Sequence, residues 1–123
     1  LPQLGENVQA AQHYEQAIRL QPNQLDVRLQ LAWLLATSVD EAARNGRRAM
    51  QLAQQVNERT QYRHHSALDA LAAAYAELGE FDQAAKWAMK AAEAAEDAGQ
   101  MQAARQIEQR LQGYLVGQPY RAE

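Results

Sequence analysis

The chain has 123 residues, a net charge of −3 and no cysteine, which fits one domain with a real hydrophobic core. Disulfides and cysteine-ligated metals are excluded, and no global positive charge exists to attract nucleic acid or anionic lipid. Charged or amide side chains interrupt every apolar stretch well before the roughly 18 residues that a membrane span needs, so no membrane insertion is expected.

The first segment indicates the second half of a helical hairpin. The chain begins with Leu1-Pro2 rather than methionine, so we expect it to be a piece of a longer protein. After Gly5, apolar residues recur at three- and four-residue steps, which predicts a helix. These residues are Val8, Ala11, Tyr14, Ala17 and Ile18. Pro22 cannot continue that helix, and Asn23 is expected to cap the next one.

The next helix is expected to begin near residue 23 and to bury an apolar stripe along its length. The stripe consists of Val27, Leu31, Ala32, Leu34 and Leu35. Ser38-x-x-Glu41 has the capping-box pattern, and Asn45-Gly46 suits a helix stop. We therefore predict a short helical turn in an insertion at 38–46. A return helix over roughly 47–57 then buries apolar side chains, namely Ala49, Leu52, Ala53 and Val56.

A second hairpin is predicted from a helix over about 62–78, a turn at Gly79 and a return helix over about 81–96. A narrow stripe of alanines on the return helix lets another helix approach closely. It consists of Ala84, Ala88, Ala91, Ala92 and Ala95. A last helix, roughly 100–116, has one apolar face (Met101, Ala104, Ile107, Leu111, Tyr114) and one polar face (Gln102, Arg105, Gln109, Arg110, Gln112). Such a helix suits the end of a stack.

Several motifs carry a resemblance to a known family. Leu68, Leu71, Ala72, Tyr75, Ala84 and Ala88 match the tetratricopeptide signature in class and spacing. Ala10-x3-Tyr14 resembles a later part of that signature, and Leu31-Ala32-x2-Leu35 an earlier part, with Arg28 in the usual Trp place. The spacing from Ala49 to Ala84 is close to the family period of about 34 residues. Over residues 5–97, the chain resembles the tetratricopeptide repeat (TPR) family.

The resemblance implies an all-α fold: a right-handed superhelical solenoid of helix-turn-helix units, with about two and a half repeats and a capping helix. A single domain would then divide into a half repeat (1–22), a repeat with an insertion at 38–46 (23–61), a repeat (62–97), a capping helix (98–116) and a tail (117–123). Segments 31–37, 71–77 and 117–121 also look like the C-terminal repeats of larger bacterial TPR proteins. Some of those are fused to glycosyltransferase or membrane modules.

In this family, the first helix of each repeat lines a concave groove that holds a peptide or a partner helix. The resemblance therefore implies a non-catalytic protein–protein interaction module. The matching groove positions are Asp26, Leu29, Gln30, Trp33, Thr37, Ser66, Asp69, Ala70, Ala73 and Glu77.

Within this groove, Leu29 and Trp33 are four residues apart and share a helix face, which would give an apolar anchor. Core packing of Trp33 is the alternative, and the sequence leaves both open. The acidic residues Asp26, Asp69 and Glu77 would disfavour an acidic ligand. Some TPR domains hold a chaperone carboxylate with cationic side chains; no cation stands at the matching positions here, so that mode is rejected. Trp87 is expected to pack against the capping helix.

The sequence favours neither an enzyme nor a metal or cofactor protein. His64 and His65 are adjacent, so on a regular helix they point apart, and His13 is distant in sequence. Ser38 and Ser66 lack a nucleophile motif, and no glycine-rich phosphate loop is present. The one basic concentration is diluted by acidic neighbours, which argues against nucleic acid. It comprises Arg44, Arg47, Arg48, Arg59 and Arg63.

Two other functions stay open at this stage. The chain could be a structural spacer or a homo-oligomerisation element that pairs through its N-terminal helix face. It could instead be the regulatory part of a larger enzyme. We expect a soluble protein whose compartment stays open, with the cytoplasm slightly favoured.

Overall fold

The computed structural model describes residues 5–122, and these form six α-helices and one short 3-10 helix. In chain order they are α1 (Glu6–Leu20), α2 (Leu25–Thr37), η1 (Glu41–Ala43), α3 (Gly46–Thr60), α4 (His65–Glu77), α5 (Phe81–Asp97) and α6 (Met101–Leu115). The expected all-α class is confirmed. The Leu1-Pro2 opening and the last tail residue, Glu123, lie outside the described residues.

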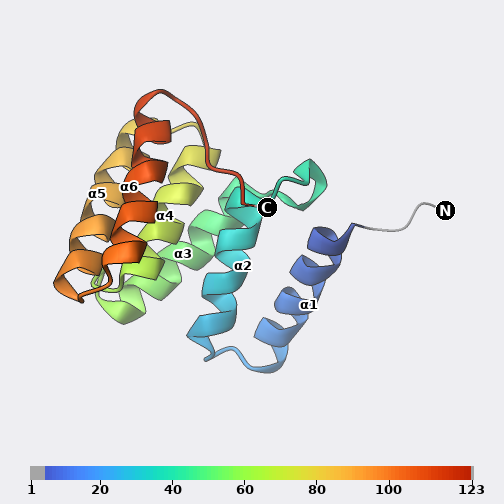
Figure 1. Cartoon of the computed structure of the whole chain (residues 1–123). Helices are drawn as coiled ribbons and strands as arrows, with labels where there is room; N and C mark the ends of the chain where they lie inside the picture. Colours follow the sequence, from blue (N-terminus) through green and yellow to red (C-terminus); the bar gives the residue numbers. More distant parts are fainter. Residues whose placement is uncertain (1–4, 123) are drawn as a thin grey trace.

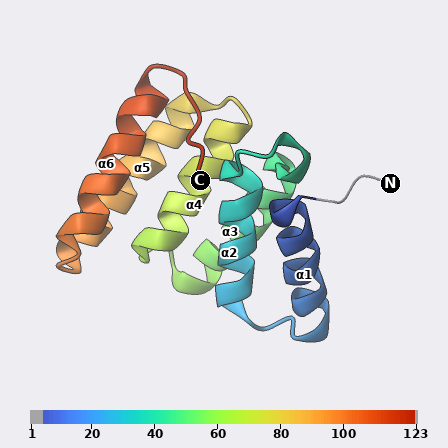
Figure 2. The same ribbon diagram turned by 45° about the vertical axis from the view of Figure 1, so that its right-hand side comes forward.

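The α-helices stand in a row, and each packs antiparallel against the next (Figure 1). Helix α2 also packs against α4, so the first helices of the two full hairpins are neighbours. The chain after α6 crosses back over α4 to the upper end of α2, as both ribbon views show (Figure 2). Within residues 5–122, no helix combines the length and the apolar character that a bilayer crossing requires.

Small side chains let the helices pack closely. Ala84, Ala88, Ala91 and Ala95 of α5 are fully buried, as the alanine stripe predicts. Helix α4 is buried along nearly its whole length because it has neighbours on several sides. Two apolar clusters fill the interior: one lies among α1 to α4 around Leu31, and the other among α4 to α6.

The predicted turn at Gly79 is confirmed, and its geometry explains the glycine. Gly79 has φ +80°, a left-handed conformation that costs other residues energy. The Glu80 amide donates to the Tyr75 carbonyl at 2.9 Å, which closes the C-terminus of α4. Helix α5 then begins at Phe81, as expected, and ends one residue beyond the expected end.

The insertion contains the predicted short helical turn, but its caps differ from the expected ones. Asp40 rather than Ser38 caps η1, because its side chain accepts a hydrogen bond from the Ala42 amide at 3.0 Å. The Ser38 hydroxyl instead accepts one from Asn7 on α1 at 2.7 Å. Asn45 begins a helix rather than ending one, since its side chain accepts from the Arg48 amide.

The two hairpins are joined differently from the expectation. Helix α3 continues to Thr60, and Gln61 and Tyr62 have φ of 61° and 56°, so α4 cannot begin at residue 62. Buried Asn57 donates to one carbonyl on α3 and one on α4, both at 2.8 Å, and so fastens the two helices. At the start of α2 the N-cap is Gln24 rather than Asn23.

Candidate functional site

The predicted groove residues of α2 and α4 differ widely in exposure. Asp26 and Gln30 are exposed, whereas Leu29, Trp33, Ser66 and Glu77 are partly buried and Thr37, Asp69, Ala70 and Ala73 are buried. Ala70 and Ala73 belong to the apolar cluster around Leu31, so they pack helices together rather than face solvent. Trp33, Thr37 and Glu77 all contact another part of the chain, which the sequence did not indicate.

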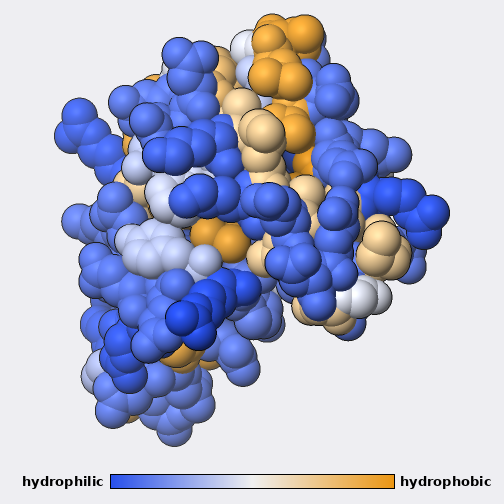
Figure 3. All heavy atoms as spheres, turned by 90° about the vertical axis from the view of Figure 1, so that its left-hand side faces the viewer, coloured by the Kyte–Doolittle hydropathy of each residue, from blue (hydrophilic) through white to orange (hydrophobic). Residues whose placement is uncertain are grey.

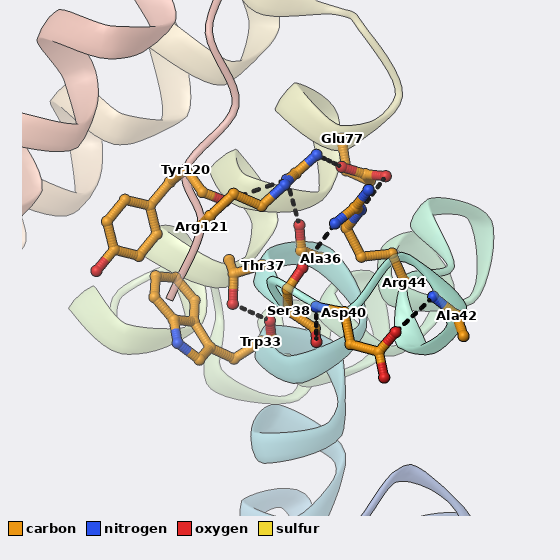
Figure 4. A network of polar contacts seen from close by, with 10 residues as sticks. All are labelled: Trp33, Ala36, Thr37, Ser38, Asp40, Ala42, Arg44, Glu77, Tyr120 and Arg121. Carbon is orange, nitrogen blue, oxygen red and sulfur yellow. Dashed lines mark hydrogen bonds and ion pairs between the residues drawn. The ribbon is translucent and has the colours of Figure 1, made fainter. Parts of the chain in front are cut away.

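That part is the return segment (residues 117–122), which follows α6. Gly117 has φ +74° at the reversal. The segment then runs extended to the end of α2, where the Ala122 amide donates to the Thr37 carbonyl at 2.8 Å. Ser38 and Ala122 form an isolated parallel β-bridge. The segment expected as a tail therefore covers the part of the predicted groove that holds Trp33, Thr37 and Glu77 (Figure 4).

An aromatic contact holds the middle of the return segment. The Trp33 and Tyr120 ring centroids are 5.7 Å apart, and the guanidinium of Arg110 lies 5.1 Å from the first ring and 5.0 Å from the second. Such ring pairs and cation–π contacts each stabilise by about 0.5–1.5 kcal/mol. Trp33 also packs on the apolar cluster around Leu31. It therefore contacts both the core and the return segment.

Arg110 also makes a bidentate ion pair with Asp69. Its Nη2 and Nε lie 2.6 and 3.2 Å from the two carboxylate oxygens, and both side chains are nearly buried. Desolvation raises the pKa of Asp69, and the neighbouring Arg110 offsets only part of that rise. The sequence placed Arg110 on a solvated face of its helix, and the structure corrects this. The sequence did contain one indication of this pair: Asp69 is a lone carboxylate inside the apolar run Leu68–Ala70, and a buried carboxylate needs a partner.

Glu77 is the second carboxylate in the groove, and it binds the return segment. Arg121 Nη2 lies 2.8 Å from Glu77 Oε1, and Arg121 Nη1 donates to the Ala36 carbonyl at 3.4 Å. Arg44 Nε is 3.4 Å from the other Glu77 oxygen but makes no hydrogen bond there. The expected absence of cations from this surface is therefore wrong, because α6 and the return segment supply them.

Open hollows adjoin both ends of the bound stretch. Beyond Ala122, a hollow of about 410 Å³ lies between α1 and α2. Its lining includes Asn7, Tyr14, Gln30 and Trp33. A second hollow, of about 330 Å³, lies beside Tyr120 and is lined otherwise by Gln106, Gln109 and Arg110 of α6. The surface could thus hold a chain longer than residues 120–122.

The remaining candidate residues are engaged in local contacts. The ring of Trp87 contacts that of Tyr62, in the turn before α4, with the ring centroids 5.5 Å apart. Trp87 also packs against the apolar cluster among α4 to α6. Arg48 pairs with Glu15 at 2.7 Å, which neutralises part of the basic concentration. The His64 and His65 rings stack 5.2 Å apart. Across the described part of the chain, no three His, Asp or Glu side chains gather in a way that could hold a metal ion.

The chain matches no model of a known protein family, no curated protein and no solved structure.

Proposed function

We propose that this chain is a non-catalytic protein–protein interaction module that holds an extended peptide on the face of α2 and α4. The observation that carries the proposal is the return segment itself. Its residues lie extended on this face through a main-chain hydrogen bond, a tilted contact between two aromatic rings and an ion pair. These are the contacts that fix an extended peptide: main-chain bonds give affinity and side-chain contacts give specificity.

The helix arrangement supports a TPR-type solenoid as the scaffold. Hairpins α2–α3 and α4–α5 follow one another, and α2 packs on α4. Stacked hairpins of this kind leave a continuous face made by the first helix of each. Helix α6 closes one end of the stack. The exposed side chains of α6 include Gln102, Arg105, Gln106 and Gln109, and also the apolar Met101 and Leu115. The side of the molecule formed by α5 and α6 is mostly hydrophilic, with an apolar band running down from its top (Figure 3).

Peptide binding is favoured over pairing through the N-terminal helix. The outward side chains of α1 are largely polar: Gln12, His13, Gln16 and Arg19 are exposed. Among the described residues of α1, Leu20 is the one large apolar residue that is exposed, with 74% of its surface accessible. A stable interface between copies needs a larger apolar centre than this. The groove offers an indole ring with polar groups around it, which suits a peptide anchor.

A test compares the two tryptophans, one in the groove and one remote from it. A random library of displayed decapeptides is selected against the purified chain, and the affinity of recovered peptides is measured with Trp33→Leu and Trp87→Leu. Leucine preserves apolar bulk but removes ring stacking. We expect Trp33→Leu to weaken binding at least about tenfold, as loss of an anchor would, and Trp87→Leu to change it little. Equal loss in both variants, or no selectable peptide, would overturn the proposal.

A further inference from the structure

The return segment leaves the groove occupied by a chemically specific sequence. Tyr120 supplies a ring to Trp33, Arg121 a guanidinium to Glu77, and Ala122 an amide to the Thr37 carbonyl. Each of the three residues meets a different partner on the scaffold, Ala122 through its main chain. The groove is therefore complementary to an aromatic residue, an arginine and a small residue in that order.

We propose that residues 120–122 are a built-in competitor for the groove, and that the partner replacing them carries an aromatic residue followed directly by arginine. This inference rests on the proposed peptide-binding function and adds the regulation and the sequence class of the ligand. The small third residue follows from the close backbone approach at Ala122, whose amide reaches the end of α2.

The charges of the groove support an arginine-bearing ligand over an acidic or neutral one. Asp69 and Glu77 are eight residues apart on α4, about two turns, so both face the groove. Asp69 keeps its partner Arg110 whether or not the return segment is bound, because both belong to the helical scaffold. When the return segment leaves, Glu77 loses its contact with Arg121, the shorter of its two ion pairs. Arg44, the other partner, makes no hydrogen bond with it. An incoming arginine restores that bidentate-capable pairing.

The tether makes the internal segment an effective competitor. A sequence joined by a short connection has an effective concentration on the order of 1 mM. If the free sequence binds at about 100 µM, the groove is then open about one tenth of the time. The apparent affinity of any external peptide falls by the same factor. A partner can overcome this by also filling the hollows beside Tyr14 and Gln109, which the segment leaves open.

The test uses the full chain and one fluorescent probe. The probe is the hexapeptide of residues 117–122, Gly-Gln-Pro-Tyr-Arg-Ala, with both ends blocked, and binding is read by fluorescence anisotropy. A released variant carries Tyr120→Ser and Arg121→Ser, and its matched control carries Gln118→Ser, an exposed position. We expect the released variant to bind the probe at least about tenfold more tightly than the unmodified chain and the control. Adding Glu77→Gln to the released variant should reverse the gain.

Three controls keep the result interpretable. Circular dichroism checks that the released variant keeps its helices, and Arg121→Gln alone provides a milder second release. A probe with serine in place of tyrosine and arginine should not bind. If the released variant and the unmodified chain bind the probe with equal affinity, the proposal that the return segment competes for the groove is overturned.

The remaining outcomes separate this inference from the proposed function. If the released variant ignores the probe but still binds selected peptides through Trp33, the ligand chemistry is wrong and the groove function stands. If it binds no peptide at all, both are wrong. A different outcome is a dimer of the unmodified chain that is lost in the variant with Tyr120→Ser and Arg121→Ser. That result would identify a second copy of the chain as the occupant of the groove and overturn the proposal of a separate peptide partner.

Discussion

Replacing Arg110 by methionine should destabilise the fold strongly, because it leaves the Asp69 carboxylate unpaired in the interior. The two side chains are only 12% and 11% exposed, and their shortest contact is 2.6 Å. Removing one member of a buried pair costs about 3–5 kcal/mol. Slight solvent access reduces this to about 2–4 kcal/mol, and the lost cation–π contacts are included in that range.

The assays are denaturant and thermal unfolding, both followed by circular dichroism, with the pair treated as a double-mutant cycle. Arg110→Met alone should lower the melting temperature by about 10 °C for a domain of this size. Asp69→Leu added to it should recover most of the loss, since an apolar pair needs no charge partner. Arg105→Met, an exposed change on the same helix, should stay within about 0.5 kcal/mol. A cost below about 1 kcal/mol for Arg110→Met, without recovery in the double variant, would refute the buried pair.

Three further changes test other parts of the structure. Asn57→Ala should cost about 1–3 kcal/mol in chemical unfolding because two buried hydrogen bonds are lost. The exposed change Gln54→Ala should cost little. Similar costs for the two variants would contradict the role of Asn57 in joining α3 to α4. Gly79→Ala should cost about 1 kcal/mol through its positive φ alone, since no atom lies within 4 Å of the added Cβ, while Gly113→Ala inside α6 should be neutral or stabilising in thermal melts. Since Asp69 has a raised pKa in the fold, the folded chain binds the proton of the Asp69 carboxyl more tightly than the unfolded chain does. The stability that this protonation contributes is fully present below the ordinary carboxyl pKa and is lost as pH rises through the raised pKa. Asp69→Asn should therefore gain stability relative to the unmodified chain as pH rises from about 4 to 7, and a parallel pH profile would refute this.

The local features of the fold could be predicted from the sequence. The helix–turn–helix around Gly79 combines a steady apolar period with a residue that tolerates positive φ, and both signals lie within a few neighbours. The burial of the alanine stripe of α5 could be predicted for the same reason. The choice between Asp40 and Ser38 as a cap was not, because Ser38 is taken by Asn7, a residue of another helix.

The occupied groove could be predicted only in part. The positions on α2 and α4 were expected from the resemblance to a repeat family, but the residues that contact them lie far along the chain. Arg110 lies among polar neighbours on its helix, so its burial depends on how α6 sits beside α4. Residues 117–122 have no helical or strand period, and their order comes from the groove rather than from local propensity. A single sequence carries no direct signal of such pairings.

Hydrogen exchange at the Ala122 amide tests the central claim most directly. In the structure this amide donates to the Thr37 carbonyl, so in the unmodified chain it should exchange more slowly than in an unstructured peptide. Adding an excess of the blocked hexapeptide should return it to the unstructured rate while the amides inside α4 stay protected. Unprotected exchange at Ala122 before any peptide is added would contradict the bound return segment and the competition built on it.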